Sequence, residues 1–140
     1  SQRHQIYFMF PVPPKDSIVY EDEKTYVCLA LEPIADGHMV VAWKRDVKDI
    51  HDLSCDEYDH LMSVVDLARD AMLEVLKIEK VYLVYMDEVR HVHWHLVPRR
   101  DERGFNVFSH KPQKISDFSL AVPLRDSVKK LLSKHKELSR

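Results

Sequence analysis

The chain has few cysteines and no internal repeat or low-complexity tract. Cys28 and Cys55 are its only cysteines, and their separation matches no metal or redox spacing such as CxxC. Cys28 lies in an apolar run, where we expect it to pack as a small hydrophobic residue. The sequence therefore predicts no cysteine-based site, and we expect a reducing, cytoplasmic setting.

Long hydrophobic runs and an excess of charge of one sign are also missing. The apolar run Ile6–Phe10 is too short for a transmembrane helix or a convincing signal sequence, and the prolines at 11, 13 and 14 end it. The formal net charge at pH 7 is -2, which argues against a broad nucleic-acid footprint. Any anion-binding site must therefore be local.

The composition is that of one folded domain. With 140 residues, 45% of them hydrophobic and 31% charged, the chain can bury a hydrophobic core without stabilising cross-links. We expect a single domain over residues 1–140. An N-terminal strap would cover residues 1–16, the core residues 17–100, and a C-terminal segment with a helix residues 101–140.

The most informative segment is 91–97, where three histidines alternate with large apolar residues. Successive side chains of a strand point to opposite faces, so this alternation predicts a half-buried strand. His91, His93 and His95 would share one face, and the apolar residues between them would pack on the other. Histidine can act there as nucleophile, proton donor or metal ligand.

The spacing of these histidines favours an anion over a shared metal ion. Cα atoms two residues apart in a strand are roughly 6.6 Å apart, and those four apart roughly 13 Å. A zinc ion holds each nitrogen at about 2.0 to 2.1 Å, so His91 and His95 are not expected to share one ion. A central imidazole can instead attack phosphorus while its neighbours, if protonated, offset phosphate charge. We therefore assign no metal and no cofactor to the site.

Residues 91–97 match the signature His-φ-His-φ-His-φ-φ, with φ apolar, at every position, and in this the chain resembles the histidine triad (HIT) family. The resemblance extends upstream through 18–22, the turn at 33–38 and 40–44. It implies a nucleotide hydrolase or nucleotidyl transferase in which the middle histidine, here His93, is transiently nucleotidylated. It also implies a homodimer.

The resemblance assigns roles to further residues. His91 and His95 would stabilise the phosphate charge, with one of them helping to protonate the leaving group, and His38 would orient the triad. Arg99 could reach phosphate from the end of the histidine strand. The substrate would be a dinucleoside polyphosphate or a nucleoside phosphoramidate.

The chain departs from the family pattern at two places. Family members usually carry Asp or Asn at the position of Ala30, where it holds the ribose hydroxyls, and Glu32 is the candidate substitute. Many members also carry Gly-Gln-Ser/Thr where this chain has Met86, Asp87 and Glu88. Two carboxylates beside a phosphate are electrostatically unfavourable, which puts the substrate and the rate in doubt.

Two other functions stay open at this point. One is a nucleotide-binding module that kept the histidines and lost catalysis. The other is a metal protein that uses His93 and His95 with His38. The remaining histidines are expected to be surface residues rather than ligands, and they are His4, His51, His60, His110 and His135.

The rest of the pattern predicts an α+β domain on an antiparallel sheet, with one long helix and a C-terminal helix. Strands are expected at 18–20, 26–31, 39–43 and 81–86, the last forming a hairpin with the histidine strand. A capping box at Ser54 and Glu57 begins the long helix, which runs through Lys77. Its core-facing residues are expected to be Tyr58, Leu61, Val65, Ala68, Met72 and Val75. Leu124, Val128, Leu131, Leu132 and Leu138 mark the C-terminal helix.

Overall fold

A computed structural model describes residues 12–86, 88–135 and 138. Five strands form one antiparallel sheet in the order β1-β2-β3-β5-β4. The strands are β1 (Ile18–Glu21), β2 (Thr25–Leu29), β3 (Met39–Trp43), β4 (Lys80–Tyr85) and β5 (His93–Arg99). The helices are α2 (Cys55–Leu76) and α3 (Ala121–Leu131), with short 3-10 turns η1 (Lys15–Ser17), η2 (Ile50–Asp52), η3 (Gly104–Ser109) and η4 (Leu132–Lys134). The predicted α+β fold is confirmed, whereas the apolar run Ile6–Phe10 lies outside the described residues.

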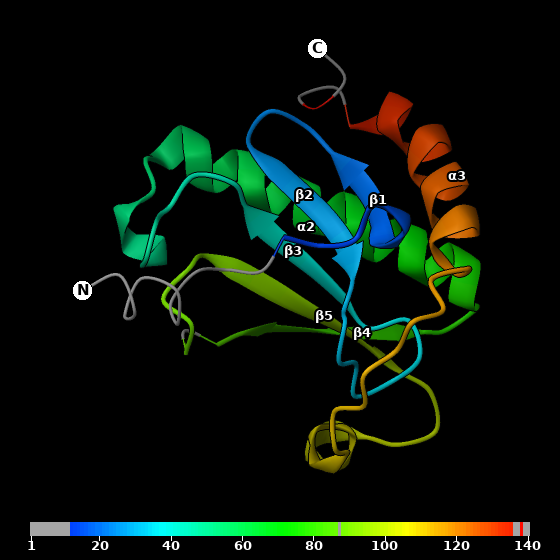
Figure 1. The fold of residues 1–140 in the computed structure, drawn as a ribbon. Helices are drawn as coiled ribbons and strands as arrows, with labels where there is room; N and C mark the ends of the chain where they lie inside the picture. Colours follow the sequence, from blue (N-terminus) through cyan, green and yellow to red (C-terminus); the bar gives the residue numbers. More distant parts are fainter. Residues whose placement is uncertain (1–11, 87, 136–137, 139–140) are drawn as a thin grey trace.

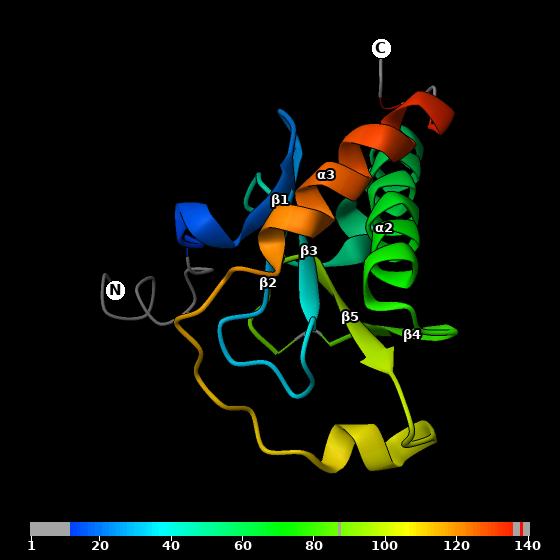
Figure 2. The same ribbon diagram turned by 90° about the vertical axis from the view of Figure 1, so that its right-hand side faces the viewer.

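Both long helices lie on the same side of the sheet, α3 alongside α2 (Figures 1 and 2). The main hydrophobic core fills the space between these helices and the sheet, and every second residue of the central strands contributes to it. Val41 and Leu96 belong to this core, whereas Val40 belongs to a smaller cluster that lies apart from it. Alternation along each strand thus divides the sheet into a helix-covered face and a second face.

The long helix has the predicted start and nearly the predicted end. Ser54 accepts from the Glu57 N–H and the Glu57 carboxylate accepts from the Ser54 N–H, so the capping box is confirmed. Lys77, with φ 55°, ends α2 in the left-handed conformation. The prediction that Tyr58 faces the core was wrong. Its side chain is 42% exposed because it lies in the first turn, before Leu61, the first buried residue of the helix.

The predicted hairpin is present, since β4 pairs with β5 in antiparallel register. The histidine strand, however, begins at His93 and not at His91. Arg90, with φ 51°, turns the chain just before it. The backbone of Val92 then pairs with Trp43 and with Val47, which lies beyond the end of β3. His91 therefore does not share the alternation of the strand.

The scattered histidines differ from one another in burial. His51 and His110 are exposed as predicted, and His4 lies outside the described residues. His60 is partly buried and contacts the Asp22 carboxylate at 2.9 Å. The prediction of a surface position was wrong for His135, which is 8% exposed because its ring lies against α2.

Among the described residues, no helix is long and apolar enough to span a membrane.

Candidate active site

A cavity of about 340 Å³ lies on the sheet face opposite the helices. Its apolar lining includes Tyr26, Cys28 and Val40, which alternate along β2 and β3 on the face that the helices leave uncovered. His93 and His95 from β5 also line it. The cavity therefore combines an apolar wall with imidazole groups, the usual character of a small-molecule site.

Strand register brings the imidazoles to this face. His93 pairs with Ala42 of β3, and His95 pairs with Val40, so both rings project on the cavity side. His38 lies directly before β3 and follows Gly37, whose φ of 92° is rarely available to other residues. A Cβ at Gly37 would also lie 2.7 Å from a Leu76 methyl group. The turn that places His38 in the cavity thus depends on this glycine.

The tautomer of His93 follows from its backbone partner. Its Nδ1 lies 2.6 Å from the carbonyl oxygen of His91. A carbonyl can only accept, so Nδ1 carries the proton and donates it. In the neutral ring this leaves a lone pair on Nε2. The nitrogen farther from the backbone is therefore the nucleophilic one.

A relay of hydrogen bonds fixes the other two rings. The Ile34 N–H donates to Nδ1 of His38 at 3.2 Å, so the proton of the neutral His38 ring resides on Nε2. That Nε2 donates to Nδ1 of His95 at 2.9 Å. The neutral His95 ring therefore carries its own proton on Nε2 and offers it as a donor.

Burial keeps both of these rings uncharged. Desolvation, with a smaller contribution from His95, lowers the pKa of His38 to about 3. Desolvation, followed by the nearby His93, lowers the pKa of His95 to about 4. At neutral pH both rings are hydrogen-bond donors without net charge. They act in the ligand-free site as oriented dipoles rather than as cations.

His91 is placed differently from the other triad members. Its Nε2–H donates to the Trp43 carbonyl at 2.5 Å, and its Nδ1 lies 4.0 Å from the Asp46 carboxylate. The His91 ring is not among the described residues that line the cavity. The prediction that all three imidazoles share one face was wrong. What His91 brings to the site is its carbonyl, which holds the ring of His93.

The predicted substrate-binding residues divide into two groups. Glu32 and Glu88 line the cavity, and so does Ala30. Arg99 is not among the lining residues, and its Nη2 lies 4.0 Å from the Glu79 carboxylate. None of the described lining residues is Lys or Arg, so the fixed charges around the cavity are carboxylates.

Sequence reasoning did not assign Tyr26 and Cys28 to the site. Burial raises the pKa of the Cys28 thiol to about 12, so it stays protonated and contributes an apolar surface. The signal was available in the order Tyr26, Cys28, Ala30. These residues alternate on the face that bears His93 and His95.

Comparisons with known proteins agree with this geometry. A family model described as "HIT domain" matches residues 14–102. The chain is 29% identical over 129 residues to an adenosine 5'-monophosphoramidase of Candida albicans, covering 81% of each protein. The adenosine 5'-monophosphoramidase of Saccharomyces cerevisiae is 31% identical over 87 residues, covering 60% of this chain and 54% of that protein.

Solved structures share the fold. The structure of a hypothetical histidine triad nucleotide-binding protein from Sulfolobus tokodaii superposes with a TM-score of 0.69 at 26% identity. The match covers 84% of this chain and 87% of that one. The similarity in fold thus extends over most of both chains.

Proposed function

Because the chain belongs to the histidine triad (HIT) family, we propose that it is a nucleotide hydrolase in which His93 is the nucleophile. The observation that carries this proposal is the hydrogen bond from His93 Nδ1 to the His91 carbonyl. It fixes the tautomer with the lone pair on Nε2, on a ring that lines the cavity. The relatives named as adenosine 5'-monophosphoramidases support a nucleotide substrate.

The proposed reaction has two balanced steps. His93 Nε2 attacks the α-phosphorus, a bond from nitrogen to phosphorus forms, and the bond to the leaving group breaks. The monoanionic substrate binds together with a proton that makes His95 an imidazolium, and this ring gives its Nε2 proton to the leaving group. Water then attacks the nucleotidyl-histidine, its proton passes to His95, and the mononucleotide leaves while His93 returns to its starting form.

The charge of the cavity lining favours one substrate class over the other. Glu32 and Glu88 are the carboxylate residues of the lining, and in the ligand-free cavity the neutral rings of His38 and His95 do not offset them. A dinucleoside polyphosphate brings several negative charges into this field, whereas a phosphoramidate carries one at its phosphorus. We therefore propose a nucleoside phosphoramidate, with Glu32 accepting from the ribose hydroxyls in place of the family carboxylate that Ala30 lacks.

Turnover on a substrate panel tests the function. The panel pairs an adenosine phosphoramidate with dinucleoside polyphosphates, and the products are separated by chromatography. We expect release of AMP from the phosphoramidate at the higher kcat/KM, with His51→Ala, at an exposed position outside the cavity, as the matched control. Nucleotide binding without any turnover would contradict the hydrolase and favour a non-catalytic binding module.

We also propose that the protein forms a homodimer through the edge of its sheet. Strand β4 is an outer strand, and Leu83 on it is 41% exposed. A second copy could extend the sheet there and cover this apolar residue. Sedimentation at micromolar concentration is expected to give the mass of two chains, and a monomer would contradict the proposal.

We further propose a cytoplasmic setting for the protein. Both described cysteines are free, which supports this setting.

A further inference from the structure

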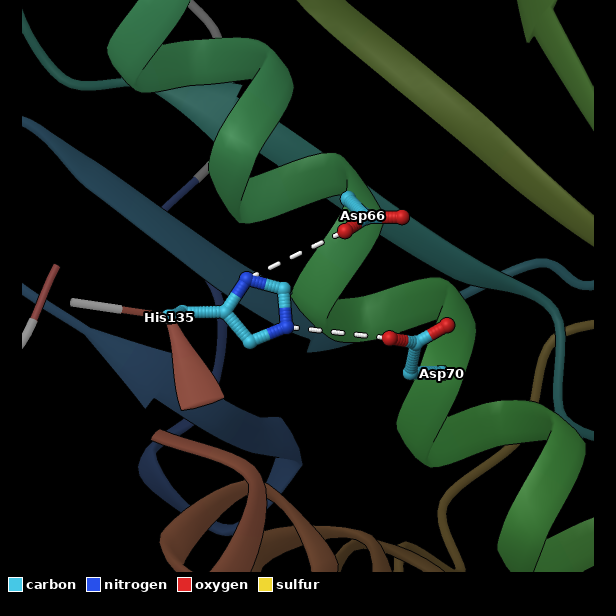
Figure 3. Close-up of side chains that lie close together, drawn as sticks. All are labelled: Asp66, Asp70 and His135. Atoms are coloured by element: carbon cyan, nitrogen blue, oxygen red, sulfur yellow. Dashed lines mark ion pairs between the residues drawn. The ribbon is translucent and has the colours of Figure 1, made fainter. Parts of the chain in front are cut away.

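A second cluster of ligand-type side chains lies on the helical side of the molecule, away from the cavity. Asp66 and Asp70 are four residues apart and therefore project from one face of α2. His135, directly after η4, places its ring against them (Figure 3). One ligand atom from each of the three residues lies within 4.8 Å of the other two.

The separations in this cluster suit an inserted ion better than a direct hydrogen bond. Nδ1 of His135 is 3.8 Å from the Asp66 carboxylate, and Nε2 is 3.6 Å from that of Asp70. The distance between nitrogen and oxygen in a hydrogen bond is at most about 3.2 Å, so neither of these contacts is a hydrogen bond. An ion about 2.1 Å from both atoms of one such pair would bind them at an angle of roughly 120 to 130°, which leaves its remaining positions to water.

One imidazole nitrogen can hold the ion while the other keeps a carboxylate as its partner. Histidines that bind metals commonly donate their second N–H to a carboxylate, so two carboxylates around one ring meet both needs. Arg69 approaches one oxygen of Asp70 at 3.5 Å, and it is the other oxygen of Asp70 that faces His135. Asp70 can therefore hold one nitrogen of His135, while the other nitrogen and the Asp66 carboxylate bind the ion.

Burial distinguishes this cluster from an ordinary group of surface charges. His135 is 8% exposed, and the polar partners of its ring among the described residues are the two carboxylates. Asp66 is exposed and Asp70 is partly exposed, so an ion can enter from solvent and retain water. The buried imidazole is aimed at the point where the two carboxylates converge.

We propose that Asp66, Asp70 and His135 form a binding site for a divalent transition-metal ion, with zinc as the probe. A mixed nitrogen and oxygen donor set suits zinc and its neighbours in the first row, whereas calcium requires six or more oxygen ligands. The bound ion links α2 to the chain segment that follows α3. Its role is to fasten the C-terminal segment, and it takes no part in the proposed hydrolysis.

Zinc titration by calorimetry tests the site on the full chain. His93 and His95 are first both replaced by alanine, so that the candidate active site cannot compete for the ion. In this background we expect one zinc per chain, and His135→Gln and Asp70→Asn should each weaken binding about tenfold or more. Saturating zinc should raise the melting temperature by roughly 5 to 10 °C.

Glu74→Gln is the matched control, because Glu74 lies one turn farther along α2 and contacts Ser127 instead of the cluster. Equal weakening by Glu74→Gln would overturn the proposal. So would an absence of binding, since the cluster would then be only an imidazole ring packed between two carboxylates. If His135→Gln does not fold, Asp66→Asn, at an exposed position, decides the outcome by the same titration.

Discussion

Successive residues of β5 point to opposite faces of the sheet, and the two faces have opposite properties. Leu96 is fully buried in the main core beneath the helices, whereas His93 and His95 project into the cavity on the other side. Packing on the helix-covered face fixes the position of the strand, because a slip of one residue would exchange the two faces. The chemistry on one face thus depends on the hydrophobic contacts of the other.

The largest effect is expected from His93→Ala. Removing the proposed nucleophile should lower kcat/KM by roughly 10⁴-fold or more, since the other imidazoles among the described lining residues, His38 and His95, carry their proton on Nε2. The free energy of unfolding should change less than for a residue of the main core, because the ring lines the cavity and does not belong to that core. Steady-state kinetics and urea unfolding on the same preparation measure both quantities. Activity close to wild type would rule out the proposed nucleophile.

Leu96→Ala should produce the reverse pattern. A fully buried leucine in the core contributes about 2 to 5 kcal/mol to the free energy of unfolding, including the cavity that its removal leaves. Its control is Val122→Ala on α3, at a position that is 54% exposed. Urea unfolding should give a much smaller loss for the control. Equal losses would mean that the helix-covered face does not hold the strand in register.

Ala30→Asp should sharpen the nucleotide preference of the cavity face. A carboxylate beside the ribose hydroxyls adds charge-assisted hydrogen bonds worth about 1.5 to 3 kcal/mol. The affinity ratio of AMP to deoxy-AMP should rise by roughly 10-fold or more, with Ala30→Asn as the uncharged control. Calorimetric titration of both ligands measures the ratio. An unchanged ratio would mean that the ribose hydroxyls do not lie within reach of residue 30.

The smallest predicted effect concerns pH. Burial lowers the pKa of His38 to about 3, whereas the pKa of an imidazole in the unfolded chain is about 6.5. Below pH 6.5 the unfolded state binds the extra proton, so the stability of the folded state falls as the pH is lowered toward 3. His38→Gln should reduce the loss of unfolding free energy between pH 7 and pH 5.5 by about 1 kcal/mol.

Urea unfolding at the two pH values measures this difference. His51→Gln, at an exposed position, serves as the control and should leave the pH dependence as in the wild type. If His38→Gln leaves the loss unchanged, the buried ring is not held neutral in the folded state.

Periodicity and capping signals were enough to predict most of the fold. The strand at Met39–Trp43, the hairpin of β4 with β5 and the capping box of α2 were all read from local pattern and agree with the structure. The position of His91 could not be read in this way. The alternation continues through it, but the turn at Arg90 and the pairing of Val92 with a loop depend on tertiary contacts.

The same limit applies to the side chains around the sites. The burial of His135 depends on how the end of the C-terminal helix meets α2, which no local pattern encodes. The hydrogen bond between His38 and His95 likewise joins residues that are 57 positions apart in sequence. Sequence reasoning could therefore identify the candidate histidines, whereas their protonation states depend on partners that only the fold supplies.

Detection of the covalent intermediate tests the central claim most directly. The protein is mixed with an adenosine phosphoramidate, quenched within milliseconds under conditions that preserve phosphorus–nitrogen bonds, and its intact mass is measured. We predict a mass increase of one adenylyl group, mapped by peptide fragmentation to His93 and absent from His93→Ala. Turnover of the same substrate with no adduct at any quench time, or an adduct on another residue, would contradict the account.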